Sequence, residues 1–314
     1  MKVVILGKGL MLANLIIGAI DAGADVVGVL RYDTTVTGTF RLFLSDLLNP
    51  SYEYTLLKHL GLKDLKFKSV NTEDFRRFLI KNNVDVVLVG TWRERISPQT
   101  FNIPTIGTVN VHPSLLPAYR GPNPYLQTIL HGEEYSGVTL HLVDENYDTG
   151  SILYQEKIKI NPQQTSKELR ERTVIVARNL VTKFFNDLNN NIITPIPQLE
   201  TKATYLKNIT GIEKMLDFMA QTSDEVFRTV KALHPFLPCY ITHKHHFFVV
   251  NPYKVTILEE EYSDKNPNDI IAKSVDEKSL TIVCKDNKAV KFDDLKLYGM
   301  RVWTKFYIKH RVKL

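Results

Sequence analysis

Two short segments of the chain carry an amide, an imidazole and a carboxylate. The first, residues 110–117, reads NVHPSLLP and contains Asn110 and His112. The second, residues 137–150, reads GVTLHLVDENYDTG and contains Asp148. An amide can donate to an oxyanion, an imidazole can take or give a proton, and a carboxylate can orient the imidazole. The combination predicts a site that moves an acyl-level carbon onto an amine.

Each of these side chains also has an ordinary structural interpretation. Asn110 fits a turn, His112 fits a hydrogen-bonded core position, and Asp148 fits an acid in a turn. All three occur inside two compact motifs, and this favours an active site over three unrelated positions. His141, in the second segment, is interpreted as structural.

The composition indicates an ordinary soluble protein that is long enough for two domains. The chain has 314 residues, of which 44% are hydrophobic and 24% charged, as in globular proteins. No apolar run reaches the roughly 18 to 20 residues that a membrane helix needs. Residues 3–6 form a short apolar run that is followed by glycines, so they fit a buried strand better than the core of a signal peptide. We predict a cytoplasmic protein without a membrane partner, and make no prediction of oligomeric state.

The two cysteines, Cys239 and Cys284, lie far apart and form no Cys-x-x-Cys pair. They fit buried thiols in a reducing compartment, although the sequence alone also allows a bridge between them.

Strand-like and helix-like patterns alternate before the final third of the chain. Residues 84–89 are almost purely aliphatic, which indicates a strand covered on both faces. A capping box at Thr165 and Glu168 opens a long helix that reaches about residue 188. This alternation predicts an α/β fold with a doubly wound, mostly parallel, Rossmann-like sheet, in which ligands bind at the carboxyl ends of strands. Asn110 and His112 fall at such an end. The expected strands are residues 3–6, 25–30, 66–70, 84–89, 107–111 and 137–143, and the other expected helices are residues 10–22 and 72–82.

The pattern changes after the long helix, where Pro195 and Pro197 follow in a polar stretch. We expect a catalytic domain at residues 1–189, a linker at residues 190–208 and a second domain at residues 209–314.

The second domain combines one helix with several short strands. A capping box at Thr222 and Glu225 opens the helix, which ends near Pro235. Short strands separated by turn residues predict a small barrel or sandwich. The strand-like runs are residues 246–250, 254–258, 272–275, 280–284 and 289–295.

Other potential ligand-binding patterns are weak. Residues 243–246 (HKHH) have no carboxylate or cysteine at ligand spacing, and alternation along a strand sends neighbours to opposite faces. An exposed hairpin is favoured there, and no metal is predicted. The opening Gly7-x-Gly9 has Leu12 where a dinucleotide fingerprint wants a third glycine. A tight strand-to-helix turn is therefore favoured over a nicotinamide site.

Residues 88–160 resemble the folate-dependent formyltransferase family. One family hallmark is Asn-x-His-x-Ser-Leu-Leu-Pro, which is found here at residues 110–117. The other is Gly-Val-Thr followed by an Asp-x-Gly turn, which is found here within residues 137–150. The resemblance implies that 10-formyltetrahydrofolate is the formyl donor and that a primary amine is the acceptor.

General chemistry agrees with this resemblance and gives each polar side chain a role. Asn110 is expected to hold the oxyanion that develops on the formyl group. His112 is expected to take the amine proton or, as imidazolium, to help bind the oxyanion. Asp148 is expected to fix the imidazole ring and stabilise its charged form. These three are the predicted catalytic residues.

The resemblance also implies a folate pocket built mainly from backbone groups. Its walls are expected at residues 89–92, at the loop of residues 114–117 and at residues 143–145. Trp92 fits either a stacking contact with the donor or a core position. The predicted donor-binding residues are Val89, Gly90, Trp92, Ser114, Leu115, Leu116, Pro117, Val143, Asp144 and Glu145.

Members of this family act on methionyl-tRNA, on amino sugars linked to nucleotides, or on glycinamide ribonucleotide. Residues 232–238 and 295–300 look like the start and the closing turn of the OB-like β-barrel appended in members that act on methionyl-tRNA. The total length also matches, so methionyl-tRNA is the predicted acceptor. A purine-pathway member would normally end near the long helix, which makes glycinamide ribonucleotide a weak alternative.

Two observations keep a nucleotide-linked amino sugar open as the acceptor. Residues 31–50 contain Arg31, Gly38 and Arg41, but no Arg-Gly-Arg-Gly run like the basic loop of the tRNA-specific members. Residues 119–124 (YRGPNP) look at least as much like the sugar-nucleotide members. A further alternative is a non-enzymatic RNA-binding protein on an idle scaffold, against which the three intact catalytic residue types argue.

The end of the chain is basic and aromatic. From residue 301 on it contains five Lys or Arg side chains and no acid, interleaved with Trp303, Phe306 and Tyr307. This pattern fits docking on a polyanion such as RNA. It fits equally a last strand and helical turn whose apolar residues are core and whose basic residues are solvated.

Overall fold

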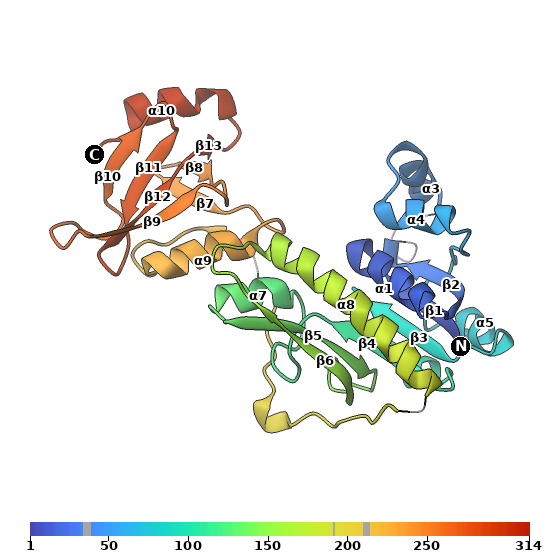
Figure 1. The fold of residues 1–314 in the computed structure, drawn as a ribbon. Helices are drawn as coiled ribbons and strands as arrows, with labels where there is room; N and C mark the ends of the chain where they lie inside the picture. The colour runs from blue at the N-terminus through green and yellow to red at the C-terminus, as the bar shows by residue number, and fades with distance from the viewer. Residues whose placement is uncertain (34–38, 191, 210–213) are drawn as a thin grey trace. The chain divides into compact units, whose positions relative to one another are not determined.

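The computed structural model describes residues 1–33, 39–190, 192–209 and 214–314 of the chain (Figure 1). The chain divides into two compact units. The two units alternate along the sequence, and the expected independent domains at residues 1–189 and 209–314 stay a prediction. The first unit consists of Met1–Pro124, Tyr135–Lys159 and Arg170–Leu206, and the second of Tyr125–Glu134, Ile160–Leu169 and Lys207–Leu314.

The first unit is built on a six-stranded mixed sheet with the strand order β2-β1-β3-β4-β5-β6. Strands β1 to β4 pair in parallel, whereas β5 is antiparallel to both of its neighbours. The α/β class is confirmed, but the sheet is mixed where a mostly parallel one was predicted. A parallel crossover needs about a dozen residues or more, and the turn between β5 and β6 is shorter than that. The strands are β1 (Lys2–Gly7), β2 (Asp25–Arg31), β3 (Val86–Gly90), β4 (Gly107–His112), β5 (Tyr135–Leu142) and β6 (Ile152–Lys159).

Helices cover both faces of this sheet and bury its central strands. All residues of β3 are buried. On one face, Phe75 of α5 (Glu73–Lys81) packs in a cluster with Val4 and Val87. On the other face, α1 (Gly9–Asp21) lies so close to Gly90 that a Cβ there would clash with Met11 and Leu15. These contacts fix the ends of β3 and β4, where the site residues lie.

Both predicted capping boxes are confirmed. The Thr165 N–H donates to Glu168 Oε2 at 2.6 Å, at the start of α8 (Ser166–Asn189). The Thr222 N–H donates to Glu225 Oε2 at 2.8 Å, at the start of α9 (Ser223–Leu233). The part of α8 that belongs to the first unit lies beside α1 (Figure 1). Gly18 of α1 lies in this contact, where only a glycine fits against the α8 backbone.

The prediction of a strand at residues 66–70 is wrong. Only Asp64 forms an isolated bridge, to Val29 of β2. Phe67 instead packs its ring edge-on against Phe75 at 5.2 Å, which draws this segment onto the core. Strand β6 and two helices after β2 were not predicted. The helices of the first unit not yet named are α3 (Thr39–Leu48), α4 (Tyr52–His59), α6 (Pro98–Phe101) and the 3-10 helix η1 (Glu200–Lys202).

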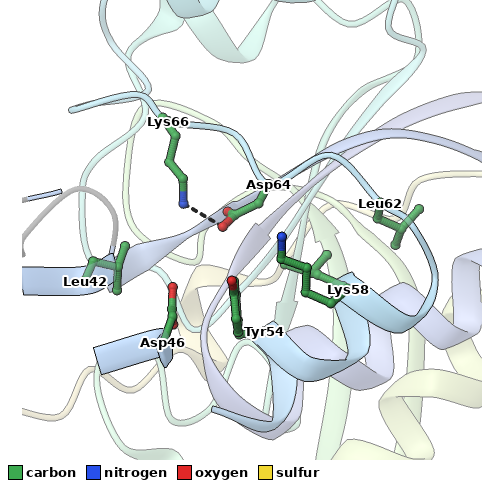
Figure 2. Close-up of a pocket in the computed structure, with 8 residues that line it drawn as sticks. Leu42, Asp46, Tyr54, Lys58, Leu62, Asp64 and Lys66 are labelled. Carbon is green, nitrogen blue, oxygen red and sulfur yellow. Dashed lines mark hydrogen bonds and ion pairs between the residues drawn. The ribbon is translucent and has the colours of Figure 1, made fainter. Parts of the chain in front are cut away.

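Arg31 at the end of β2 is buried in an ion-pair network. Its side chain donates to Asp46 at 2.7 Å and to Asp64 at 2.8 Å, and it is 2% exposed. Burial by itself lowers the pKa of Arg31, but the bonds to the two carboxylates raise it above its ordinary value. Figure 2 shows the neighbouring pocket of about 360 Å³, where Lys66 is bonded to Asp64. The acids of this pocket are therefore already paired. Gly38 lies outside the described residues.

The N-terminus of α1 is filled by a side chain of the protein itself. Gly9 has a φ of +63°, as a tight turn requires, and its N–H donates to Glu53 Oε1 at 3.0 Å. A carboxylate thus occupies the position where a dinucleotide phosphate binds in other folds. This agrees with the prediction of a turn instead of a nicotinamide site.

The second unit contains two small antiparallel sheets, ordered β10-β11-β12-β9 and β13-β8-β7. These strand-rich sheets are compatible with the expected small C-terminal β domain. In the last helix Tyr307 and Ile308 are buried, as core residues would be. Phe306 of that helix and Trp303 of the preceding 3-10 helix are more than half exposed, and docking of the tail on a polyanion stays a prediction. The strands are β7 (Tyr240–His243), β8 (His246–Val249), β9 (Val255–Glu261), β10 (Ile270–Ser274), β11 (Ser279–Val283), β12 (Lys288–Phe292) and β13 (Lys296–Leu297). The remaining helices are α7 (Pro124–Leu130), η3 (Arg301–Trp303) and α10 (Thr304–Arg311).

The histidine cluster at residues 243–246 forms the predicted hairpin. His243 pairs with His246 across β7 and β8, and Tyr307 Oη lies 3.1 Å and 3.3 Å from their Nδ1 atoms. Within the described ranges, no group of three or more His, Cys, Asp or Glu side chains is arranged to hold a metal ion.

Cys239 and Cys284 are both free and buried. Burial raises the pKa of each thiol to about 12, so neither is reactive at neutral pH. No helix in the described part of the chain has both the length and the apolar character needed to cross a bilayer.

Candidate active site

The end of β4 delivers Asn110 and His112 to the same face of the sheet, because they are two residues apart on one strand. Strand β4 lies between β3 and β5, and in that register Asn110 lies opposite His141. Asp148 comes from the turn that follows β5. That turn returns tightly, because a Cβ on Gly150 would lie 1.9 Å from the Leu142 carbonyl oxygen.

The structure brings the three predicted catalytic side chains within direct contact distance. Asn110 Nδ2 donates to Asp148 Oδ1 at 3.3 Å. His112 Nδ1 lies 3.4 Å from the same oxygen. The second oxygen, Oδ2, accepts the backbone N–H of Gly121 at 2.9 Å. Asp148 Oδ1 is therefore the atom that both other side chains approach.

The surroundings of Asp148 keep its carboxyl group ionised. Burial by itself raises the pKa of Asp148, but the nearby His112 and His141 rings and the Gly121 N–H outweigh it and lower the pKa to about 2. The site therefore holds a fixed negative charge at neutral pH.

One ring nitrogen of His112 is hydrogen-bonded, and the other faces the Asp148 carboxylate. Its Nε2 lies 2.9 Å from the Tyr119 carbonyl oxygen, which can only accept, so Nε2 carries a hydrogen. Its Nδ1 is then the atom that gains or loses a proton beside Asp148. Burial lowers the pKa of His112, opposed by Asp148 and by the bond to Tyr119. Burial thus favours the neutral ring, and a proton gained at Nδ1 is stabilised by Asp148.

His141 belongs to the same cluster, a contact that the structural interpretation of this residue did not include. Its Nδ1 lies 2.8 Å from the Leu142 carbonyl oxygen and must donate, so Nε2 is the ring nitrogen that can accept. That acceptor lies 3.0 Å from Asn110 Nδ2. If the Asn110 amide were turned around, its oxygen would face the Asp148 carboxylate, and both groups only accept. His141 and Asp148 together therefore fix the orientation of the amide. The register of β4 against β5 places the two residues opposite each other, and the sequence carried no signal for that register.

The predicted donor-binding residues at the ends of β3 and β5 lie near one another. Val89, Trp92 and Val143 pack against one hydrophobic cluster, and Gly90 ends β3. Trp92 Nε1 is buried, and among the described residues it has no hydrogen-bond partner. The indole ring packs edge-on against Tyr32 at 5.2 Å, so its face is not stacked on that side chain.

The side chain of Asp144 and the backbone of Glu145 serve the turn itself. Asp144 Oδ1 accepts the Thr149 hydroxyl at 2.6 Å. The Glu145 carbonyl oxygen accepts from Arg95. These bonds hold the segment that leads to Asp148.

The loop of residues 114–117 is largely turned inward. Ser114 Oγ donates to the Ala118 carbonyl oxygen at 2.8 Å, and Ser114 is fully buried. Leu115 packs so closely under β5 that a Cβ on Gly137 would clash with it. Leu116 is 3% exposed, and Pro117 is bonded through its carbonyl oxygen to the Thr204 N–H. The loop supports β4 and β5 through packing.

Comparison with known proteins finds similarity over most of the chain. A family model described as "Formyl transferase" matches residues 1–183. The methionyl-tRNA formyltransferase of Halothermothrix orenii is 30% identical over 271 residues, which cover 85% of this chain and 84% of that protein. The methionyl-tRNA formyltransferase of Kosmotoga olearia is 26% identical over 98% of this chain and 96% of its own length.

A solved structure of similar fold is the N-formyltransferase from Helicobacter canadensis in complex with folinic acid and dTDP-3-aminofucose. It matches with a TM-score of 0.68 and 19% identity over 93% of this chain and 99% of that chain.

Proposed function

The chain belongs to the formyl transferase family, and on that premise we propose that it transfers the formyl group of 10-formyltetrahydrofolate to the amino group of methionyl-tRNA. The observation that carries the proposal is the contact of Asn110 and His112 with the single carboxylate of Asp148. The reaction forms a bond from the acceptor nitrogen to the formyl carbon and breaks the bond from that carbon to the folate nitrogen. The amine loses a proton, and the departing folate nitrogen gains one.

His112 is proposed to take the proton of the attacking amine. Its Nδ1 is the basic atom, because the Nε2 hydrogen is held by the Tyr119 carbonyl group. Asp148 lies beside Nδ1 and stabilises the imidazolium as it forms. The same proton is then suitably placed for return to the leaving folate nitrogen.

Asn110 is proposed to donate to the oxygen of the formyl group as negative charge develops. In the resting protein its two N–H groups point at His141 Nε2, at 3.0 Å, and at Asp148 Oδ1, at 3.3 Å. The longer contact is the weaker one and is the one expected to yield to the oxyanion. One such donor contributes about 3 kcal/mol to the transition state.

Trp92 supports the proposed folate site at the end of β3. A buried indole N–H without a partner is costly unless a ligand accepts its hydrogen. A reduced pterin has ring nitrogens and a carbonyl oxygen that can accept. Val143 packs against the same cluster and provides apolar surface for the ring.

Methionyl-tRNA is proposed as the acceptor because the similarity to the Halothermothrix orenii protein continues well beyond residue 183. The second unit contains the two small sheets, which we propose to form the expected OB-like barrel. Its last helix presents exposed basic residues. A cytoplasmic location is part of the same proposal, in keeping with the two free thiols.

A nucleotide-linked amino sugar is the second candidate acceptor. The specific observation in its favour is Arg31, which is buried between Asp46 and Asp64 and is not free to contact an acceptor arm. Arg41, the other arginine of residues 31–50, is exposed on α3.

One assay separates these possibilities. Purified protein is given 10-formyltetrahydrofolate with either aminoacylated initiator tRNA or a panel of nucleotide-linked amino sugars, and the formylated product is measured. Formylation of methionyl-tRNA alone is the expected result. Formylation of a sugar alone would move the protein to the second candidate. Absence of turnover with all acceptors, together with tRNA binding, would favour a non-enzymatic RNA-binding protein.

A further inference from the structure

The stretch expected to be part of a linker runs instead as an ordered segment along the active site. We call residues 196–206 the site strap. At its start, Ile196 and Ile152 of β6 exchange two backbone hydrogen bonds of 2.8 Å each. At its end, the Leu206 N–H donates to the Arg120 carbonyl oxygen at 3.1 Å. All of these residues belong to the first unit.

The site strap contacts both loops that complete the catalytic cluster. One is the loop of residues 117–121, which supplies the Tyr119 carbonyl group to His112. The Tyr119 N–H donates to Thr204 Oγ1 at 2.8 Å, and the Arg120 N–H donates to the Thr204 carbonyl oxygen at 2.9 Å. The other is the turn of residues 148–150, which supplies the catalytic carboxylate.

Gln198 is the strap residue that holds this second loop. Its Nε2 donates to the carbonyl oxygens of Asp148, at 2.9 Å, and Gly150, at 2.8 Å. Its Oε1 accepts from Arg120 Nε at 3.2 Å and Nη2 at 2.8 Å. Carbonyl groups only accept and guanidinium groups only donate, so the amide has one possible orientation. Every polar atom of the Gln198 side chain is used.

Arg120 links the strap to the other loop. Its side chain is 6% exposed and forms a two-pronged contact with Glu200, at 2.7 Å and 2.9 Å. The hydrogen bonds from Arg120 lower the pKa of Glu200. A planar guanidinium bonded to both Gln198 and Glu200 cannot rotate without breaking both contacts.

The two loops need such support because their key residues have strained backbones. Tyr119 has a φ of +60° and Asp148 a φ of +59°, in the left-handed region that non-glycine residues rarely adopt. Such conformations persist only where the surroundings impose them. The strap bonds to the backbone at both positions, and the Gly121 N–H joins the loops through Asp148 Oδ2.

We propose that the site strap is part of the active site and that Gln198 is a positioning residue, which holds the Asp148 turn so that its carboxylate faces His112. This inference rests on the proposed roles of His112 and Asp148. Gln198 acts through the carbonyl groups of the turn and does not touch the reacting atoms. Loss of its two N–H donors frees the turn while the catalytic side chains remain present.

The test compares two substitutions that separate the two sides of the Gln198 amide. Gln198→Met keeps the length of the side chain and removes all of its hydrogen bonds. Gln198→Glu keeps acceptors for Arg120 but has no donors for the carbonyl groups. Gln163→Met, at an exposed position of the second unit, is the matched control. Formyl transfer is measured with 10-formyltetrahydrofolate and whichever acceptor the unmodified protein uses.

Both Gln198 variants are expected to lower kcat by about tenfold to a hundredfold, as misplacement of a catalytic group does, with KM for the folate nearly unchanged. In an Asp148→Asn background, the same substitutions are expected to have little further effect, because they act through that residue. Thermal unfolding is measured for each variant, and Gln198→Glu serves as the test if Gln198→Met does not fold.

Normal kcat in the Gln198 variants would overturn the inference. So would full activity of Gln198→Glu alone, which would assign the role to the Arg120 contact, or an equal loss in the Asp148→Asn background. A near-normal kcat for Asp148→Asn by itself would instead overturn the proposed role of Asp148, and absence of formyl transfer by the unmodified protein would overturn the proposed function, so these failures are distinguishable.

Discussion

The Nδ1 atom of His112 lies 3.4 Å from Asp148 Oδ1 while the opposite ring nitrogen is bonded to the Tyr119 carbonyl oxygen. The ring is therefore fixed through Nε2, and Nδ1 is the nitrogen atom available for proton transfer. Because burial lowers the pKa of His112, it favours the neutral ring, which can act as a base.

The first prediction concerns the two side chains of β4. Asn110→Ala and His112→Ala are each expected to lower turnover about a hundredfold or more, because each removes a group used in the transition state. Folate binding, measured by fluorescence titration or calorimetry, is expected to stay close to normal. Near-normal turnover in either variant would contradict the role given to that residue.

The second prediction concerns acid stability. The pKa of Asp148 is about 2 in the folded protein, against an ordinary value of 3.8, so the unfolded chain binds the proton more readily. The resulting stability is present above about pH 4 and is lost as the pH falls toward 2. The pKa difference corresponds to about 2 kcal/mol.

Asp148→Asn removes this contribution. Urea unfolding of both proteins at pH 7 and at pH 3 measures the change in unfolding free energy between the two pH values. That change is expected to be smaller in the variant. Equal pH dependence in the two proteins would show that the Asp148 pKa is not lowered by folding.

The catalytic triplet was predictable because its residues are close in sequence to strand ends. Asn110 and His112 share one strand face, and the Asp-x-Gly turn directly follows the neighbouring strand, so local pattern and sheet topology suffice to bring them together. The contact of His141 with Asn110 depends on the exact register of β5, which composition does not reveal.

The remaining features depend on contacts across long stretches of chain. Gln198 reaches Gly150 only because the strap folds back on β6. The sequence pattern did not indicate this, because a polar stretch that contains prolines is typical of a linker. The burial of Arg31 by Asp46 and Asp64 likewise depends on residues far along the chain. Phe67 leaves the expected strand because its ring packs on Phe75. In each case tertiary packing overrode the local pattern.

The third prediction tests the contact between His141 and Asn110. His141→Gln offers an oxygen that can accept from Asn110 Nδ2, whereas His141→Leu offers none. We expect turnover to fall about tenfold in the leucine variant and to be largely retained in the glutamine variant, since a misdirected amide loses part of its contribution. Melting temperatures serve as the control for folding. Equal turnover losses in both variants would assign His141 a packing role only.

The fourth prediction concerns the buried indole N–H of Trp92. Trp92→Phe keeps an aromatic ring and removes only the donor and the second ring. If the N–H bonds to the folate, Kd for the folate is expected to rise about tenfold, the worth of one buried hydrogen bond. Trp303→Phe, at a residue that is 57% exposed in the second unit, is the matched control. Unchanged folate affinity in Trp92→Phe would exclude this contact.

The last prediction concerns the basic end of the chain and the choice of acceptor. Complete removal of residues 301–314 would confuse the result, because Tyr307, Ile308 and Val312 are buried in the second unit. Charge reversal at the exposed positions Lys305 and Lys309 leaves that core intact.

If these lysines bind phosphates, the double variant Lys305→Glu/Lys309→Glu binds tRNA more weakly, and the slope of log affinity against log salt falls by about one unit for each phosphate that is no longer neutralised. Affinity for the folate donor is the internal control and is expected to stay unchanged, because the predicted donor residues lie in the first unit. A tRNA affinity and salt slope equal to those of the unmodified protein would place the acceptor-binding surface elsewhere. Indifference of the unmodified protein to tRNA at low salt would exclude tRNA as the acceptor.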